Sequence, residues 1–497
     1  MDREKTKEEA FKIPIEELFP KFEEHLEIKD NTRILFSGKF GIGKTYFLND
    51  FFKNHQERYE VFHFFPVNYQ ININEDILEF LKYDILVELN KKNKDIFQKN
   101  DYSNLIDLQR LLFIWGKNNF SEIFKTGLSF ISRLGRPLKE VAGLMENFWS
   151  FKNEIEAGEE GFVKDFLEKT RKKNITETDY LSELLKEKIK AQKGDKQSVL
   201  ILDDLERIDP EHIFRILNVF SVHLGLQNEE LPNKFNFDRV ILVADVQNLK
   251  SIFHCKYGEQ TDFNGYFDKF FSEEIFEFEN EEIIAKYVDE IISRFQAEDK
   301  LSQSLKNKGY FLQIILKDIL LKSLKLDGKE KLNLRQLLRG IKFPLPALKE
   351  GSYKEGFIHT RDQSIPQIIN IGIKTLISIF GGIKIDFISV LRKIRDNVSD
   401  KEHTTGHSGY YRTLSYYLLR SVSSFKETED NLKHGWGDKY SVEIDNKNKE
   451  IKSVSRRITE RGLNTTTYTE ADVSGLFFDL LIEYVSRKLY DKQIELI

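Results

Sequence analysis

The first part of the chain alternates between short apolar runs and longer amphipathic segments. Runs at 32–37 and 61–68 predict strands, because strands that are buried on both faces read as nearly continuous hydrophobic stretches. Segments 45–55 and 74–92 repeat their apolar residues at helical spacing and predict helices. Strands that alternate with helices are typical of an α/β fold with a parallel sheet.

The strand pattern is interrupted and then returns. Residues from about 100 to 190 are rich in Lys and Glu at helical spacing, whereas the segments 197–209 and 239–249 begin with apolar runs and again predict strands. A weaker run at 273–280 predicts one more strand. After residue 281 the pattern is mostly helical, except at 439–455, where two alternating halves flank a polar turn and predict a β-hairpin.

These patterns predict an α/β domain with a parallel sheet and a helical insertion, followed by a mostly α-helical C-terminal region. The stretch between Thr45 and Asp203 is about 100 residues longer than one strand with its helices needs. The expected organisation is a core, an insertion, a helical lid and a C-terminal domain, with the following boundaries: 1–95 and 196–280, 96–195, 281–345, and 346–497.

Composition narrows the classes of protein that fit. The 497 residues are 40% hydrophobic and 13% aromatic, which excludes a disordered chain. The net charge of −5 excludes a globally basic nucleic-acid wrapper. A single cysteine, Cys255, excludes a disulfide framework and a cysteine-based zinc module, and fits a reducing cytoplasm. His403 and His407 lie in a loop-like stretch without a third ligand and are interpreted as solvated loop residues.

Nothing in the sequence predicts a membrane span or a signal peptide. The first ten residues are charged, and no uninterrupted apolar run reaches the roughly 20 residues that cross a bilayer. The most apolar stretch, 363–391, contains charges, a proline and paired glycines, and is interpreted as buried helices of the C-terminal domain. We therefore expect a cytoplasmic protein that does not contact a membrane.

Residues 38–45, GKFGIGKT, match the phosphate-binding pattern G-x-x-x-x-G-K-[ST] between a predicted strand and a predicted helix. Glycines allow the backbone to curl so that its N–H groups face a phosphate at the start of the helix. In this pattern the lysine reaches the β- and γ-phosphates and the hydroxyl ligates Mg²⁺. The expected nucleotide-binding residues are Gly38, Lys39, Phe40, Gly41, Ile42, Gly43, Lys44 and Thr45.

A pair of acids follows the buried strand at 197–202. Asp203 and Asp204 emerge at its carboxyl end, where ligands of open α/β sheets bind. Asp203 is expected to hold Mg²⁺ through water, beside the Thr45 ligand. Asp204 or Glu206 is expected to polarise the attacking water, with Asp204 preferred because it adjoins the metal ligand. A helix cap is the alternative interpretation of Asp204. The expected catalytic residues are Lys44, Asp203, Asp204 and Glu206.

Three further residues fit a nucleotide site. Asp245 ends the strand at 239–244, where it is expected to sense the γ-phosphate; a plain strand-end turn is the alternative. Arg335 and Arg339 are four residues apart on a predicted helix and are expected to reach a phosphate from the lid; a solvated basic face is the alternative. Guanine recognition needs an N-K-x-D element, which the chain lacks after its late strands, so ATP is favoured over GTP.

Together these residues resemble the KAP family of P-loop NTPases, over roughly residues 10–345. DDLER (203–207) is similar to the family's D-D-L-D-R, with Glu206 in place of the usual Asp. PVNYQ (66–70) is similar to a strand motif F-N-A-W but lacks its Trp, and Asn333, Arg335 and Arg339 match the N-x-R-x-x-x-R of a lid helix. The resemblance implies ATP, Mg²⁺, kinship with STAND and AAA+ ATPases, and a large insertion before DDLER.

Many family members carry transmembrane helices in that insertion. Here 111–152 is broken by charges every few residues, which predicts a soluble helical subdomain; an interfacial membrane helix pair is the alternative. The expected function is a slowly turning ATPase that acts as a nucleotide-driven switch on a protein partner or a second copy, and the resemblance suggests bacterial anti-phage defence. Two alternatives stay open: a scaffold that binds ATP without hydrolysing it, and an ATPase or clamp stimulated by nucleic acid.

Overall fold

The computed structural model divides the chain into two compact units, and each is described by itself. The first comprises Ile15–Glu279, and the second comprises Asn280–Ile497 with Met1–Pro14. The described residues are 13–69, 76–93, 96, 180–221, 233–308, 310–342, 344–346, 365–397, 408–423, 431–436, 440–459, 466–470 and 473–490. Most of the predicted insertion at 96–195, as well as His403 and His407, lies outside these ranges.

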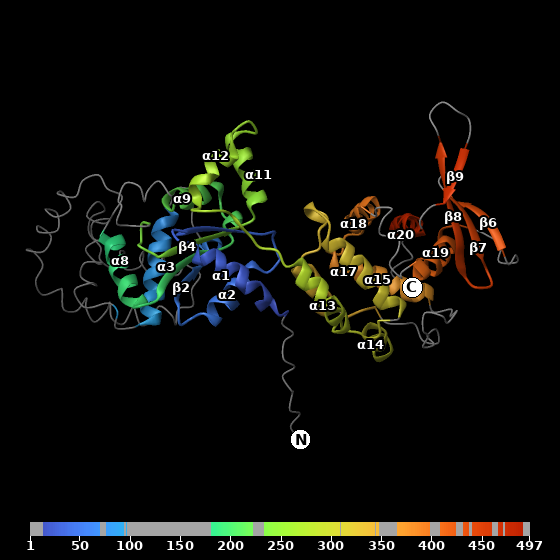
Figure 1. Cartoon of the computed structure of the whole chain (residues 1–497), viewed down its shortest axis with the longest axis horizontal. Helices are drawn as coiled ribbons and strands as arrows, with labels where there is room; N and C mark the ends of the chain where they lie inside the picture. The colour runs from blue at the N-terminus through green and yellow to red at the C-terminus, as the bar shows by residue number, and fades with distance from the viewer. Residues whose placement is uncertain are drawn as a thin grey trace, which may run out of the picture. The chain divides into compact units, whose positions relative to one another are not determined.

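The first unit is built on a five-stranded parallel sheet (Figure 1). Its strand order is β2-β3-β4-β1-β5, and each neighbouring pair is parallel, which confirms the predicted α/β fold. The three central strands are buried along almost their whole length, as expected for a sheet covered on both faces. The strands are β1 (Arg33–Ser37), β2 (Tyr59–Phe64), β3 (Gln197–Leu202), β4 (Arg239–Ala244) and β5 (Phe276–Glu277).

Helices cover both faces of this sheet because successive strand residues point to opposite sides. On one face, Phe36 of β1 contacts Phe22 and Phe47, which belong to α1 (Phe19–Glu27) and α2 (Lys44–Asn54). On the other face, Leu35 joins a continuous hydrophobic core. The helices that contribute to that core are α3 (Ile77–Lys92), α8 (Tyr180–Lys193), α9 (Pro210–Val219), α11 (Val246–Tyr257) and α12 (Phe263–Phe267).

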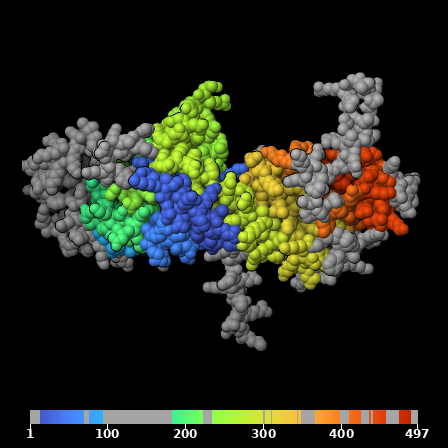
Figure 2. Space-filling model, in the orientation of Figure 1, coloured from blue at the N-terminus to red at the C-terminus, as the bar shows by residue number. Residues whose placement is uncertain are grey.

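Short 3₁₀ turns connect several of these elements. They are η1 (Ile15–Leu18), η2 (Pro66–Asn68), η3 (Leu205–Arg207) and η4 (Asp268–Phe270). The predicted helix at 45–55 corresponds to α2, and α8 is the described part of the predicted helical insertion. The segment that holds α11 and α12 forms a yellow-green projection in Figure 2.

The second unit is mainly helical, as the sequence predicts, and also contains a four-stranded antiparallel sheet. The helices are α13 (Glu281–Ser293), α14 (Asp299–Lys306), α15 (Phe311–Leu324), η5 (Gly328–Glu330), α16 (Leu334–Lys342), α17 (Ile365–Ile379), α18 (Lys384–Asn397), α19 (Ser408–Val422) and α20 (Val473–Tyr490). The strands are β6 (Asn431–Trp436), β7 (Tyr440–Asp445), β8 (Glu450–Thr459) and β9 (Thr466–Glu470). Strands β7 and β8 pair across the turn where the sequence predicts a hairpin, and β6 and β9 extend it on either side.

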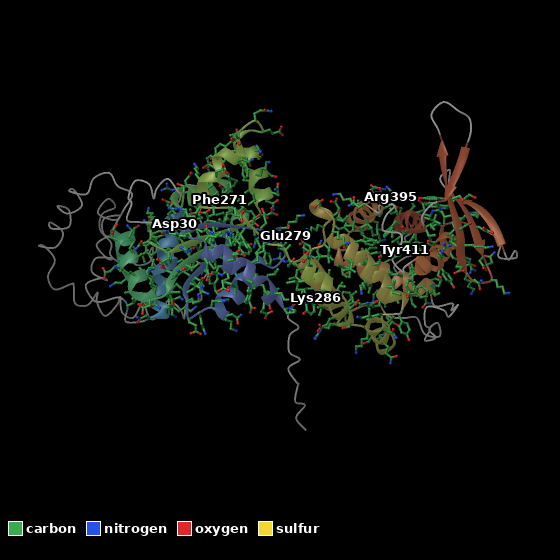
Figure 3. All side chains as sticks on the ribbon, viewed as in Figure 1. Asp30, Phe271, Glu279, Lys286, Arg395 and Tyr411 are labelled. Atoms are coloured by element: carbon green, nitrogen blue, oxygen red, sulfur yellow. The ribbon has the colours of Figure 1, made fainter. Side chains whose placement is uncertain are left out.

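Polar contacts that are partly or fully buried connect the parts of the second unit. Arg395, labelled in Figure 3, donates to Asp479 on α20 at 2.8 Å, and the Tyr440 hydroxyl of β7 donates to the same carboxylate at 3.0 Å. Tyr411, also labelled, donates from α19 to Asp318 on α15 at 2.6 Å. Hydrogen bonds to a buried carboxylate stabilise a fold by about 1.5–3 kcal/mol each, so these contacts hold the helices and the small sheet together.

The apolar helices of the second unit are short. In the part of the chain that the structure describes, no single helix is long and apolar enough to cross a membrane. Helices α17 and α18 satisfy the length and composition requirement only when taken together, and they are bent by 102° at the break between them.

Candidate nucleotide-binding site

The P-loop connects β1 to α2 and starts beside β4. The backbone N–H of Gly38 donates to the carbonyl of Ala244, the last residue of β4, at 3.2 Å. Gly41 and Gly43 have φ values of 82° and 100°, a left-handed backbone that glycine adopts without steric cost. These two residues turn the chain so that α2 begins at Lys44 with its first N–H groups facing the loop.

The remaining loop residues differ in their surroundings. A Cβ atom on Gly38 would lie 2.7 Å from the Cδ1 atom of buried Ile42 and 3.3 Å from the carbonyl oxygen of Phe278, so a larger residue there would require the Ile42 side chain to move. Phe40, by contrast, is 40% exposed at the rim of the loop. The guanidinium of Arg207 lies 5.9 Å from its ring centroid. Lys39 contributes a carbonyl oxygen 3.5 Å from the amine of Lys44.

Lys44 lies inside the loop and contacts both parts of the predicted site. Its Nζ donates to the carbonyl of Gly38 at 2.6 Å and is 3.6 Å from Oε1 of Glu206. Both side chains are about 5% exposed or less. The buried ammonium is therefore held by a loop carbonyl and by the acid that follows β3, close to where phosphate oxygens bind in a P-loop.

Thr45 and Asp203 meet although strand β4 separates β1 from β3. The Thr45 hydroxyl donates to Oδ2 of Asp203 at 2.7 Å, and the Asp204 N–H donates to the other carboxylate oxygen at 2.7 Å. Asp203 is fully buried. The structure thus brings together the two residues for which the sequence predicts Mg²⁺ ligation.

Glu206 lies in η3, the turn that follows Asp203 and Asp204. Its side chain is 4% exposed, and within the described residues neither carboxylate oxygen has a hydrogen-bond partner. Burial raises the pKa of the Glu206 carboxyl above its usual value, and the charge of Lys44 and the nearby backbone N–H groups of Glu206 and Asp245 offset part of that effect. A buried carboxylate without hydrogen bonds is uncommon and marks a place where a ligand or water completes the site.

Asp204 has a different environment. Its backbone is left-handed, with a φ of 58°, and its side chain forms an ion pair with Arg207 at 2.6 Å. The Arg207 side chain is 48% exposed, so this pair faces solvent. The two acids that the sequence offers for polarising water are therefore separated: Asp204 is paired at the surface, and Glu206 is buried beside Lys44.

Asp245 ends β4 next to the P-loop and caps α11. Its carboxylate accepts the N–H groups of Gln247 at 3.0 Å and Asn248 at 3.3 Å. This accounts for its position after a strand as a helix N-cap. Contact with a γ-phosphate stays a prediction.

The predicted lid arginines lie in the second unit. Arg335 and Arg339 are both on α16, and Asn333 caps that helix through reciprocal hydrogen bonds with Gln336. This arrangement is a capping box, which accounts for Asn333 without a nucleotide. Contact between the two arginines and a phosphate stays a prediction.

The sequence interpretation missed His63. This residue is near the end of β2, and its Nε2 lies 3.1 Å from Oδ2 of Asp203. Its Nδ1 lies 3.0 Å from the side-chain oxygen of Asn49 on α2. The available signal was a single polar residue inside an apolar strand, on the edge of the sheet where ligands bind.

These residues fit a nucleotide with Mg²⁺. The glycines turn N–H groups toward the loop, Lys44 supplies a cation, and Glu206 is a buried acid without a hydrogen-bond partner among the described residues. Thr45 and Asp203 offer the hydroxyl and the carboxylate with which proteins commonly hold Mg²⁺ alongside phosphates.

A comparison with known families agrees with this site. The KAP family P-loop domain matches residues 22–341. The chain belongs to the KAP family of P-loop NTPases. The match begins inside α1 and ends inside α16, so the KAP domain of this protein includes the whole parallel sheet, the P-loop, DDLER and both lid arginines. No curated protein matches the chain.

Proposed function

We propose that this KAP protein binds ATP with Mg²⁺ and hydrolyses it slowly, as a nucleotide-driven switch. The observation that carries the proposal is the hydrogen bond between Thr45 and Asp203, beside Lys44 and Glu206. A P-loop with a purely structural role would not need these groups. Thr45 and Asp203 form a hydroxyl–carboxylate pair, and beside it lie a buried lysine and a buried acid that has no hydrogen-bond partner among the described residues.

The residues have distinct roles in this proposal. Lys44 leaves the Gly38 carbonyl and binds the β- and γ-phosphate oxygens, which Mg²⁺ also neutralises when it is bound by Thr45 and Asp203. Water attacks the γ-phosphorus, the bond to the β–γ bridging oxygen breaks, and ADP leaves with the electron pair. The proton of the water passes to an acid of the chain.

We infer that this acid is Glu206 rather than Asp204. A general base works best when its pKa is close to the working pH, and burial moves the pKa of Glu206 in that direction. Asp204 is occupied by Arg207 at the surface. This inference replaces the preference for Asp204 that its place beside Asp203 suggested.

We also propose that ATP binding changes the structure around the site and that a partner senses this change. Movement of Lys44 and Glu206 on ATP binding would alter η3 and the rim of the P-loop, and ordered segments that depend on the γ-phosphate are a common nucleotide switch. We expect the predicted insertion and lid to transmit this change to a protein partner or a second copy. Phage challenge of bacteria that express wild type or Lys44→Ala protein tests the defence role.

Turnover of ATP and GTP by purified protein tests the enzymatic core. We expect Mg²⁺-dependent phosphate release from ATP that Lys44→Ala abolishes, and a weaker reaction with GTP. Tight ATP binding without release in any condition would favour the scaffold alternative. Stimulation by DNA or RNA that weakens with salt would favour the nucleic-acid alternative.

A further inference from the structure

We propose that His63 is a positioning residue that holds the Asp203 carboxylate in the orientation required for Mg²⁺ binding. The inference rests on the proposed function and adds a residue to its metal site. It follows from a set of four side chains, Thr45, Asn49, His63 and Asp203, that hydrogen bonds connect in series.

The series joins three elements of the first unit. On α2, Thr45 donates to Oδ2 of Asp203 at 2.7 Å. His63 of β2 contacts the same oxygen at 3.1 Å, and its other ring nitrogen contacts Asn49, one turn after Thr45 on α2, at 3.0 Å. The Asp203 carboxylate, which follows β3, is therefore hydrogen-bonded both to α2 and to the neighbouring strand β2.

Strand geometry explains why His63 reaches this place. Residues on one face of a strand recur with a period of two, so Tyr59 and His63 share a face of β2. Tyr59 contacts Phe52 of α2 on that face, with ring centroids 5.4 Å apart. Phe62 and Phe64 belong to the hydrophobic core on the opposite face. The imidazole consequently points toward α2 and not into the apolar core.

The ring itself is held in place. It stacks on Phe65 with centroids 4.6 Å apart and planes 24° apart, and its side chain is 12% exposed. Asp203 carries no polar hydrogen when ionised, so the Nε2–H of His63 is the donor in their contact. The Asn49 amide can present either its oxygen or its NH₂ group to Nδ1, since the two are interchangeable by rotation.

The contact matters most when the metal is bound. The Thr45 hydroxyl is then engaged as a ligand, and among the described side chains His63 is the remaining donor to Oδ2 of Asp203. Partners that orient a metal-binding carboxylate typically change metal affinity by about 10–100-fold when they are removed. Loss of the Nε2–H donor should therefore weaken Mg²⁺ binding and leave metal-free ATP binding intact.

Two substitutions test the two ring nitrogens of His63 one at a time. In His63→Gln the side-chain amide nitrogen replaces Nε2 and keeps the donor to Asp203. In His63→Asn the amide nitrogen replaces Nδ1, keeps the contact with Asn49 and loses the donor to Asp203. Both variants are uncharged and of similar polarity, so each is the matched control for the other.

The experiment measures binding, not turnover. A fluorescent ATP analogue is titrated onto wild type, His63→Gln and His63→Asn in EDTA, and Mn²⁺ or Mg²⁺ is then titrated onto each nucleotide-loaded protein. We expect metal affinity about tenfold or more weaker in His63→Asn, within about threefold of wild type in His63→Gln, and unchanged nucleotide binding in EDTA. Far-UV circular dichroism and thermal unfolding report whether each variant is folded.

The outcomes distinguish the inference from the function on which it rests. If wild type binds no ATP in the presence of metal, the proposed function fails and the inference fails with it. If wild type binds metal and nucleotide while His63→Asn keeps full metal affinity, the inference alone is wrong. Equal loss of nucleotide binding in EDTA by both variants would also overturn it, because the role of His63 would then be structural. Asn49→Ala leaves the Nε2 donor in place and should weaken metal binding by less than His63→Asn does.

Discussion

The two edges of the parallel sheet use acidic side chains in opposite ways. At the amino edge, Asp238 accepts hydrogen bonds from the Lys193 amine and from the backbone and hydroxyl of Ser198, at 2.6 to 2.9 Å. At the carboxyl edge, Glu206 is more deeply buried but has no hydrogen-bond partner within the described residues, and its nearest cation is 3.6 Å away.

The number of hydrogen bonds that an acid accepts distinguishes a structural acid from a functional one. A buried acid with several donors stabilises the fold, whereas a buried acid without them costs stability and is retained for another reason. The amino edge should therefore respond to substitution with lost stability, and the carboxyl edge with lost chemistry.

The largest effect is expected for Lys44→Ala. This change removes the buried cation that is proposed to bind the phosphates, and loss of such electrostatic stabilisation lowers turnover by about 10³-fold. Phosphate release from ATP under saturating Mg²⁺ measures it. Equal rates in wild type and variant would show that the P-loop is not the site of hydrolysis.

Glu206→Gln should lose chemistry without losing stability. Removal of a general base is expected to lower turnover by about 10²-fold, and nucleotide binding should persist. Because the pKa of Glu206 is raised on folding, its ionised form disfavours the folded state, and that penalty grows as pH rises above the usual pKa of a glutamate.

The free energy of unfolding of Glu206→Gln should consequently equal or exceed that of wild type at neutral pH. The difference should shrink as pH falls and Glu206 binds its proton. Urea unfolding at several pH values, beside single-turnover rates, tests both halves of this prediction. A Glu206→Gln variant that is less stable than wild type and equally active would show that Glu206 is a structural residue and not the general base.

Asp238→Asn should show the opposite behaviour. Burial acts to raise the pKa of Asp238, but hydrogen bonds from Lys193 and Ser198 outweigh it and leave the pKa below its usual value. The stabilisation is therefore present above the usual pKa of about 3.9 and is lost as pH falls through the lower folded value.

We expect Asp238→Asn to lower the free energy of unfolding by about 1–2 kcal/mol at neutral pH, since hydrogen bonds to a charged group are lost. Wild type and variant should converge in strong acid. Turnover of the folded variant should match that of wild type. A selective loss of turnover would mean that the amino edge contributes to the site.

The smallest effect is expected for Asp204→Asn. Its ion pair with Arg207 faces solvent, and such pairs contribute about 0–1 kcal/mol. Turnover should change by less than about threefold, because Asp204 is not the proposed base. A loss as large as that of Glu206→Gln would restore Asp204 as the catalytic acid.

Local patterns explain which parts of the fold and the site could be predicted from the sequence. β1, β3 and β4 are apolar runs with few exceptions, so the sheet was predictable. The P-loop was predictable because the glycines of GKFGIGKT adopt the left-handed backbone that the loop requires. The meeting of Thr45 with Asp203 was also predictable, because both follow parallel strands whose carboxyl ends share one edge.

The other features of the site and the fold depend on contacts between distant residues, which no local sequence pattern reveals. Asp204 and Glu206 are two residues apart, and the turn in η3 decides which of them is buried. His63 resembles any polar residue in a strand until the register beside β3 brings it to Asp203. β6 and β9 were missed because short polar strands acquire their structure from the neighbours β7 and β8 with which they pair.

The most direct test compares two aspartates of one sheet, Asp203 at the carboxyl edge and Asp238 at the amino edge. Mg²⁺-dependent phosphate release from ATP is measured for wild type, Asp203→Asn and Asp238→Asn at a temperature where all three are folded. We predict a loss of about 10²-fold or more for Asp203→Asn and a rate within about threefold of wild type for Asp238→Asn. Retained turnover in Asp203→Asn, or an equal loss in both variants, would contradict the claim that the carboxyl edge hydrolyses ATP.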